Sequence, residues 1–365
     1  MRLTNLFKNY NWPLFLSAFF LVLFGIMMIY STTFNLRAPF LKSFTFRQII
    51  FALIGFGVML IVSQVHYRAL SNYTLHLYLL ILVLLILVII FGRVTRGAVS
   101  WLRLGPFNIE PSEIAKLVMI IVLAKHFAKR ISLVLGFKEI ILSFIYIVIP
   151  VFLVAIQPDF GSAFIIFLIY LGMLLMVRVS KTQLLVTFSV LLIASILVWS
   201  FVLLDYQKER LLNFLNPFKE PLGTGYSTIQ SMIAVGSGNI LGQGLGRGFQ
   251  SQLNFLPEKH TDFIFAAIAE ELGLVGASVI IILFGIFLFS IIRVIRNCSD
   301  NFGKLIGVGS IIMVLSQALI YIGMNTGIMP VTGIPLPFVS YGGSSLVVNL
   351  LLVGILQSIW VRNRL

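Results

Sequence analysis

A short stretch of the chain, residues 254–273, gathers ionisable side chains that could do acid–base chemistry. Glu258, Lys259 and Asp262 stand close together, and Glu270 and Glu271 follow two helical turns later. Only 10% of the residues are charged, so this density is unusual for the chain. A carboxylate near a membrane surface could serve as a general base, which makes Asp262 a candidate. The alternative is that Asp262 caps a helix start, and the local pattern favours this slightly.

Two other stretches place carboxylates where they could work. In GPFNIEPSEIAKL (105–117), Glu113 and Lys116 are three residues apart and share a helix face. They form either a simple salt bridge or one wall of a cavity that accepts an anionic headgroup. In QPDFGS (157–162), Asp159 either caps the next helix or lines the site. Two carboxylates just before a membrane span need partners or water, so Glu270 and Glu271 imply a polar cavity.

Further residues could contact a charged or lipid-linked substrate. Trp101 and Arg103 lie in RGAVSWLRLG (96–105), although a lone tryptophan near an interface is often only a belt residue. Ser340 lies in MPVTGIPLPFVSYGGSS (329–345), a proline-rich and glycine-rich stretch before the last apolar run. Non-helical backbone at that depth is tolerated where it lines a cavity. The segment predicts a second part of the site.

Phosphate-loop and metal motifs are not supported. The glycines of GSGNILGQGLGRG (236–248) match no nucleotide-binding pattern and read as turn glycines, although their N–H groups could help to bind an anion. The four histidines show no metal-ligand spacing, and His260 reads as a structural residue. The single cysteine, Cys298, excludes an internal disulfide.

The composition defines the elements that must position these residues. Of 365 residues, 59% are hydrophobic, far above the share in a soluble domain. The chain is therefore predicted to be an all-α, multi-pass membrane protein forming one domain over residues 1–365. Ten spans are expected near 12–34, 47–64, 73–92, 112–128, 138–156, 160–178, 182–204, 274–296, 304–326 and 341–361.

The charge distribution predicts the orientation. Short basic loops lie on the side of both termini, which the positive-inside rule places in the cytoplasm. Nearly all acidic residues then fall on the outer side, where a large loop (about 205–273) joins spans 7 and 8. A helix beginning near 262 is expected there, with a bend at Gly273 and Gly276 into the eighth span. The net charge of +14 reflects these loops and indicates no nucleic-acid partner.

Five motifs in order resemble the SEDS family of bacterial shape, elongation, division and sporulation proteins. They are FNIEPSEIAKL (107–117), QPDFGSA (157–163), NPFKEPLGTGYSTIQSMIAVGSG (216–238), QSQLNFLPEKHTDFIFAAIAEELG (250–273) and GIPLPFVSYGGSS (333–345). Within the family, SQLNFLPE and the compact length favour the rod-shape branch over the division branch. Glu110 departs from the pattern, because glutamine is common there, and Asn108 lies in a variable stretch.

The resemblance implies a ten-span peptidoglycan glycosyltransferase of the bacterial cytoplasmic membrane that polymerises lipid II on the outer face. It also implies a class B penicillin-binding protein and the elongation machinery as partners. The family's essential aspartate corresponds to Asp262, its cavity pair to Glu113 and Lys116, and its sensitive loop tryptophan to Trp101.

The leaving pyrophosphate needs positive charge. This charge could come from Arg103, Lys116, Arg210 and Lys259. A divalent cation such as Mg²⁺ or Mn²⁺ could also supply it. A flippase of lipid-linked precursors is the main alternative, and a scaffold for wall synthesis is a weaker one. The crowding of charge on one face favours one-sided chemistry over alternating access.

Overall fold

The fold was analysed in a computed structural model. The structure describes residues 9–34, 43–95, 98–104, 107–130, 135–187, 216–223 and 225–363, together with the single residues 189, 200, 208 and 214. Most of the predicted span 182–204 and the site candidate Arg210 therefore lie outside the described residues.

The described chain is mostly helical, as predicted. Its long helices are α2 (Trp12–Thr33), α3 (Phe44–Gln64), α5 (Thr74–Phe91), α6 (Pro111–Ala128), α7 (Phe137–Ile156), α8 (Phe160–Leu175), α13 (Ile264–Asn297), α14 (Asn301–Asn325) and α15 (Gly343–Arg362). Seven of those described are long and apolar enough to cross a membrane. The helix α6 carries more charge, and α8 is shorter than the predicted span 160–178.

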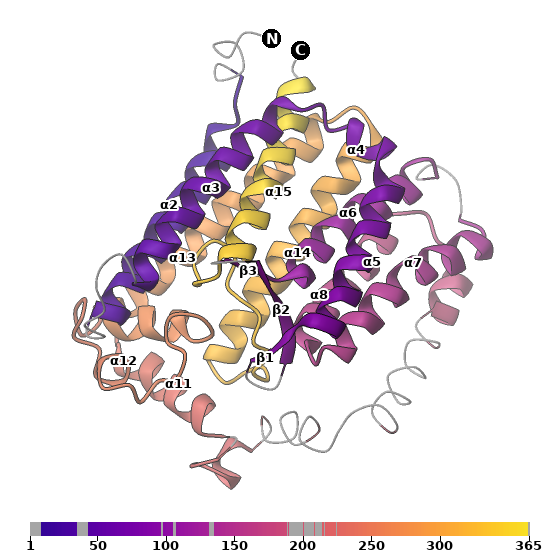
Figure 1. Ribbon diagram of the computed structural model, residues 1–365. Coiled ribbons are helices and arrows are strands. Elements are labelled where there is room, and N and C mark those ends of the chain that lie inside the picture. The colour runs from indigo at the N-terminus through magenta and orange to yellow at the C-terminus, as the bar shows by residue number, and fades with distance from the viewer. Residues whose placement is uncertain are drawn as a thin grey trace.

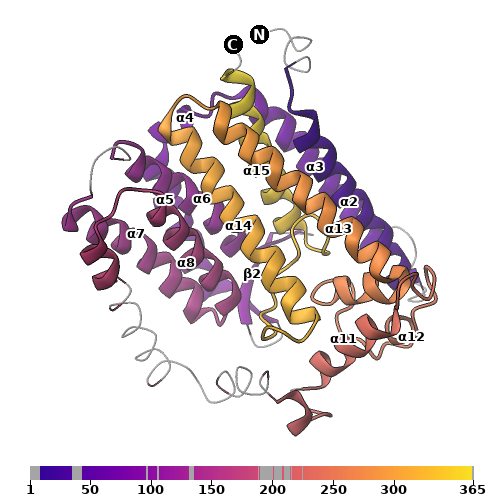
Figure 2. The same ribbon diagram turned by 180° about the vertical axis from the view of Figure 1, so that it is seen from behind.

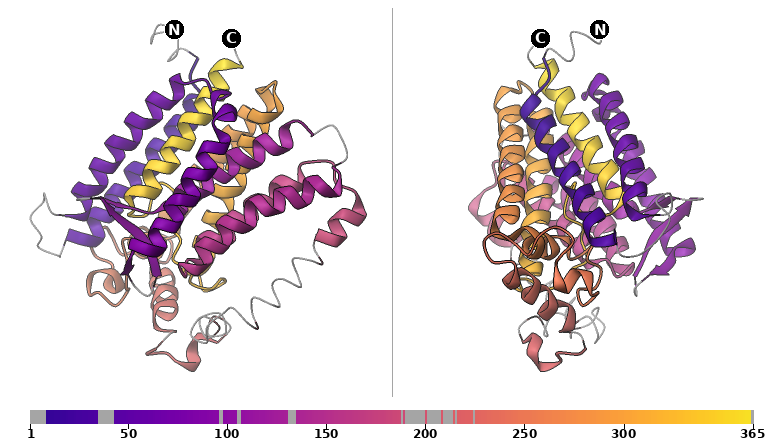
Figure 3. Two further views of the ribbon diagram at one scale, coloured as in Figure 1. Left: turned by 45° about the vertical axis from the view of Figure 1, so that its right-hand side comes forward. Right: turned by 90° about the vertical axis from the view of Figure 1, so that its left-hand side faces the viewer.

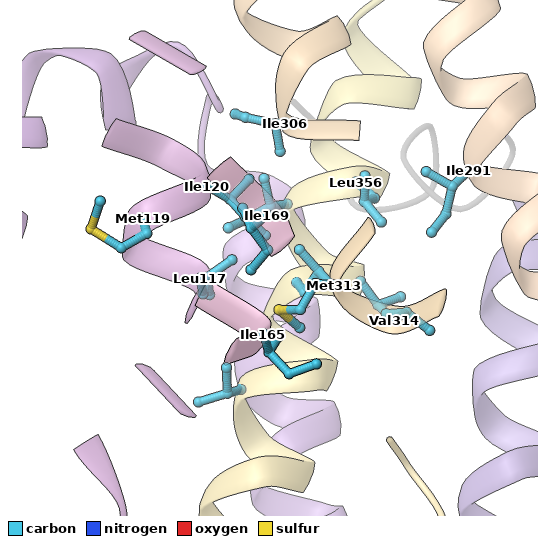
Figure 4. Packing of buried hydrophobic residues seen from close by; sticks show 14 of the residues in the cluster. Leu117, Met119, Ile120, Ile165, Ile169, Ile291, Ile306, Met313, Val314 and Leu356 are labelled. Atoms are coloured by element: carbon cyan, nitrogen blue, oxygen red, sulfur yellow. The ribbon is translucent and has the colours of Figure 1, made fainter. Parts of the chain in front are cut away.

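The helices form a bundle with the first residues of α2 and the last residues of α15 at the same end (Figure 1). The helix α15 packs along α3, α13 along α2, and α6 lies among α5, α8 and α14. Apolar side chains of α6, α8 and α14 fill the space between these helices, as Figure 4 shows for Leu117, Ile120, Ile165, Ile169 and Met313. This packed layer supports the polar residues Glu113 and Lys116, which lie one turn earlier in α6.

The remaining elements are short. They are α4 (Ala69–Asn72), the strands β1 (Arg93–Thr95), β2 (Ala98–Leu104) and β3 (Phe107–Ile109), the 3-10 helix η4 (Pro217–Lys219), α11 (Tyr226–Ser237) and α12 (Phe249–Gln252). The strands form an antiparallel sheet in the order β1-β2-β3, which the sequence analysis did not predict. Figure 3 shows the sheet, α11 and α12 toward the end of the bundle away from the termini.

The helix α13 bends at Gly273, as the sequence predicted. Gly273 has φ 67°, a conformation that favours glycine, and it separates residues 264–272 from the long apolar part of the helix. The bend leaves backbone groups on both sides without helical partners, and the loop after α11 supplies them. Leu274 N–H donates to Asn239 O (2.9 Å), whereas Gly244 N–H donates to Glu271 O (2.9 Å).

Candidate active site

Asp262 lies in a turn, residues 257–263, that leads into α13. The backbone N–H groups of Thr261 and Asp262 both donate to Glu258 O, at 3.1 Å each. The helix begins at Ile264, and its N-cap residue is Phe263, whose side chain makes no capping hydrogen bond. Asp262 therefore does not occupy the N-cap position. Asp262 stands one residue too early, and its side chain remains partly exposed.

Two side chains of α14 hold the backbone of this turn by hydrogen bonds. The Tyr321 hydroxyl donates to Thr261 O (2.6 Å) and accepts from Ile264 N–H (3.0 Å). The Asn325 amide donates to Asp262 O (3.1 Å) and accepts from Ala266 N–H (3.0 Å). Tyr321 and Asn325 are fully buried. The backbone on both sides of Asp262 is thus fixed by groups whose own rotamers are locked by packing.

Segment 327–342, between α14 and α15, holds the same turn from another side. The Ser340 hydroxyl donates to Thr261 O (2.9 Å) and accepts from Leu336 N–H (3.0 Å). Gln48 of α3 ties the segment down by donating to Ser340 O (3.2 Å). The predicted site residue Ser340 therefore meets the Asp262 turn, and the second half of this non-helical stretch, residues 334–342, is mostly buried.

His260 has the structural surroundings that the sequence analysis assigned to it. Its ring lies against Phe44 at 4.4 Å and against Tyr341 at 5.7 Å between centroids. Its carbonyl accepts from Tyr341 N–H (2.9 Å). The contacts join α3, segment 327–342 and the Asp262 turn.

The α6 pair is a buried salt bridge. Lys116 Nζ lies 2.7 Å from Glu113 Oε1, and both side chains are 0% exposed. Burying two charges carries a large desolvation cost that only close pairing and further hydrogen bonds offset. The second oxygen, Glu113 Oε2, has no hydrogen-bond partner within the described part of the chain. The pair is therefore formed but not saturated.

Two more carboxylates lie near this pair. Desolvation raises the pKa of the Glu110 carboxyl well above its ordinary value, and the negative charges of Glu113 and Asp159 act in the same direction. Asp159 caps α8 by accepting from Ser162 N–H (3.0 Å), which confirms the capping interpretation. Its Oδ2 atom is buried without a partner among the described residues. The charge of Lys116 acts on the Glu110 pKa in the opposite direction, so Glu110 interacts with two carboxylates and one lysine.

Segment 327–345 connects this acidic group with the Asp262 turn. Glu110 N–H donates to the Ser344 hydroxyl (3.0 Å), and that hydroxyl donates to Asn108 O (3.1 Å). On the other side, Gly161 lies so close to Thr332 O that an added Cβ would be 2.8 Å from it. The starts of α6 and α8 and the turn before α13 therefore meet on one segment.

Glu270 and Glu271 are both 0% exposed, and the loop after α11 surrounds their carboxylates. Glu270 accepts from Ser251 N–H (3.0 Å) and from the Ser251 hydroxyl (2.5 Å). Glu271 accepts from Gly246 N–H (3.1 Å), from the Gln252 amide (3.1 Å) and from the Ser31 hydroxyl. One N–H of the glycine-rich stretch, that of Gly246, does bind an anion, but the anion is the Glu271 carboxylate of the same chain.

Lys259 is committed to the same loop. Its ammonium donates to Ser251 O and to Asn254 Oδ1 (2.9 Å), and the side chain is 6% exposed. Burial lowers the pKa of Lys259, while the charges of Glu271 and Glu270 act to raise it. Lys259 stands three residues before Asp262, so these bonds link the loop to the Asp262 turn.

The remaining candidates fall on the sheet or beyond the described residues. Trp101 lies in β2, opposite Arg93 of β1, and is partly buried. The backbone of Arg103 pairs with Asn108 of β3. Among the described residues, no group of three or more His, Cys, Asp and Glu side chains is arranged to hold a metal ion. The described residues thus offer no such cluster for a resident cation, and no step of the reaction is assigned to one.

Sequence reasoning missed Tyr321, Asn325 and Gln48. Their only signal was a polar group within an apolar span, where such groups are costly unless they bond to a neighbour. That signal marks a residue as structurally important but does not say which turn it holds.

The fold defines a multi-pass helical membrane protein. The family model described as cell cycle protein, which spans FtsW, RodA and SpoVE, matches residues 11–365. The chain belongs to this family, which is the SEDS family named by the motif resemblance.

The chain aligns with curated relatives and with a solved structure over most of their lengths. The chain is 37% identical over 313 residues to peptidoglycan glycosyltransferase MrdB of Escherichia coli K12, covering 85% of this chain and 84% of that protein. It is 36% identical over 361 residues to the probable peptidoglycan glycosyltransferase FtsW of Geobacter sulfurreducens, covering 97% and 96%. A solved peptidoglycan synthase complex, described as coordinating polymerization and crosslinking, contains a chain with TM-score 0.80 and 29% identity, covering 97% and 98%.

Proposed function

We propose that this chain is a peptidoglycan glycosyltransferase that polymerises lipid II into glycan strands on the outer face of the bacterial cytoplasmic membrane. Membership of the family and the names of its relatives support the reaction class. The observation that carries the proposal is the Asp262 turn. Its backbone is clamped by buried Tyr321, Asn325 and Ser340, while the carboxylate stays partly exposed.

In the proposed reaction Asp262 is the general base. A sugar hydroxyl is a poor nucleophile, so a base within hydrogen-bond reach must accept its proton as it attacks. The new bond joins that oxygen to the anomeric carbon of the donor sugar, and the bond from this carbon to the lipid pyrophosphate breaks. One displacement converts the α-linked donor into a β-linked glycan. A clamped backbone favours this step because it fixes the carboxylate before substrate arrives.

The Glu113–Lys116 pair is the proposed contact for the charged headgroup. The ammonium supplies positive charge, and Glu113 Oε2, which is buried and has no partner among the described residues, would accept from a donor that reaches it when substrate binds. Trp101, Arg103, Asp159 and Arg210 stay predicted substrate contacts. The predicted Mg²⁺ or Mn²⁺ ion also stays a prediction.

The cellular setting is part of the proposal. The synthase complex whose chain resembles this one couples polymerization with crosslinking, which supports a class B penicillin-binding protein as partner. We propose that the chain works in cell elongation with its cytoplasmic termini opposite the active site. The chain is similarly identical to MrdB and to FtsW, so sequence identity does not distinguish elongation from division. Genetic complementation tests the elongation role.

The test uses purified full-length chain and fluorescent lipid II, with and without Mg²⁺ or Mn²⁺ and a cognate class B penicillin-binding protein. The wild type should form a ladder of glycan chains on a gel. Asp262→Asn should lower the rate by about 10²–10⁴-fold, the usual contribution of a general base. Glu258→Gln, in the same turn, is the matched control and should keep its activity.

Two outcomes would overturn the proposal. A correctly folded Asp262→Asn variant with wild-type ladders would remove Asp262 as the base. A wild type that forms no ladder but moves lipid II between the leaflets of proteoliposomes would make the chain a flippase.

A further inference from the structure

The loop after α11 exposes apolar side chains to an unusual degree. Within residues 239–255, Leu241 is 81% exposed, Ile240 65%, Phe249 60% and Leu245 50%. Leu253 and Phe255 are exposed as well, and Phe255 stacks on Phe249 with 6.2 Å between ring centroids. Contiguous exposed apolar surface marks a place where a membrane or another partner binds.

Backbone hydrogen bonds fix this loop level with the ends of two membrane helices. Val275 N–H, in the first turn after the bend of α13, donates to Ile240 O (3.2 Å). Gly246 N–H donates to the hydroxyl of Ser31, in the last turn of α2, at 2.9 Å. Figures 1 and 2 both show α12 beside the ends of α2 and α13. Residues 240–249 therefore lie at the depth where these helices leave the apolar region.

The exposed face of the loop continues the lipid-facing surface of those helices. Tyr30 of α2 is 50% exposed, and Leu274 of α13 is 62% exposed. Both are large apolar residues in the turns that the loop contacts. Exposed apolar side chains on the spanning helices and on the loop that contacts them point to the same occupant for both, the lipid.

The charges of the loop fit the same occupant. Arg247 is the only ionisable residue between 239 and 256, and it is exposed between Leu245 and Phe249. Glu270 and Glu271 are buried under the loop and bonded by it, so they present no carboxylate to the bilayer. Apolar side chains with a single cation are suited to the interface, where a basic group can reach lipid phosphates.

We propose that residues 239–255 form a lipid-contacting surface whose apolar side chains Leu241, Leu245 and Phe249 enter the outer leaflet beside α2 and α13. Arg247 lies at the level of the lipid phosphates. The buried carboxylates of Glu270 and Glu271 keep the loop folded at this depth. The surface belongs to the protein itself and does not depend on its catalytic activity.

Site-directed spin labelling of the full chain in nanodiscs of phosphatidylethanolamine and phosphatidylglycerol tests the depth directly. The one native cysteine, Cys298, is buried, and a Cys298→Ala background removes it. Labels are introduced by Leu241→Cys, Leu245→Cys and Phe249→Cys. Ile282→Cys, on an exposed position of α13, provides the lipid reference, and Glu220→Cys, on the exposed outer segment, provides the aqueous reference.

The measurement compares collision of each label with oxygen, which concentrates in lipid, and with a water-soluble nickel chelate. The ratio at all three loop positions should lie closer to the Ile282 reference than to the Glu220 reference. A ratio at the Glu220 level would overturn the proposal, and so would labels shielded from both reagents, which indicate a protein partner or a second copy. Ile240→Cys and Leu253→Cys replace any variant that does not fold.

Discussion

The two pairs of buried ionisable residues in this chain differ in how completely their oxygens are bonded. Glu270 and Glu271 are surrounded by backbone N–H groups, hydroxyls and an amide. Glu113 has a lysine on one oxygen and no described partner on the other. A saturated carboxylate has little capacity left for substrate and holds structure, whereas an unsaturated one can still bind. The contrast separates a folding device from a substrate contact within the same site.

The largest effect should follow from breaking the α6 pair. Lys116→Met leaves Glu113 buried without its cation and should lower the free energy of unfolding by about 3–5 kcal/mol. The double variant Glu113→Gln/Lys116→Met removes both charges and should recover most of this loss. Thermal unfolding in detergent micelles measures both. If the pair also contacts the headgroup, the double variant stays inactive on lipid II although it is folded.

Removing one carboxylate at a time should loosen different parts of the loop. Glu270→Gln and Glu271→Gln should each cost about 1–3 kcal/mol, because each leaves buried donors with a weaker acceptor. Hydrogen exchange separates them. Glu270→Gln should speed exchange at Ser251 N–H, and Glu271→Gln at Gly246 N–H.

The structural role given to Glu270 and Glu271 would be wrong if the Ser251 and Gly246 N–H groups kept their protection from exchange in both variants. The KM for lipid II would then rise instead. That result would make these carboxylates substrate contacts, as the sequence first indicated, rather than positioning residues.

How much the sequence could predict depended on the distance over which each contact acts. The Asp159 cap, the Glu113–Lys116 pair and the bend at Gly273 are local, because each involves residues within one helical turn or one strained glycine. The clamp on Asp262 comes from α14, more than fifty residues away along the chain. Without a fold, nothing in the local pattern connects Tyr321 with Thr261, so the Asp262 turn read as a helix cap.

A glycine substitution tests how tightly the loop encloses Glu270. A Cβ on Gly248 would lie 2.6 Å from Glu270 Oε2, and it would also collide with the Ser251 hydroxyl. Gly248→Ala should therefore destabilise the protein, near the lower end of the about 1–3 kcal/mol typical of overpacking. Gly236→Ala in α11 is the matched control, because nothing lies within 4 Å of its added Cβ. That control should be neutral or stabilising by up to about 1 kcal/mol. Equal thermal stability of the two variants would show that the loop has room around the carboxylate.

The smallest effect on stability is expected from the Glu110 carboxyl, which lies beside Glu113. The pKa of Glu110 is raised in the folded protein above its ordinary 4.5, so between these two values the folded chain holds a proton that the unfolded chain releases. The contribution of Glu110 to stability therefore falls as pH rises through this window. Glu110→Gln keeps the shape without the charge, so its Tm relative to wild type should increase from pH 4.5 upward and level off above the folded pKa. Thermal unfolding from pH 4.5 to 8.5 measures this difference, with the exposed Glu220→Gln as a flat control. A difference that does not change with pH would mean that neither burial nor the charges of Glu113 and Asp159 raise the pKa of Glu110. The unsaturated region would then consist of Glu113 Oε2 and Asp159 Oδ2.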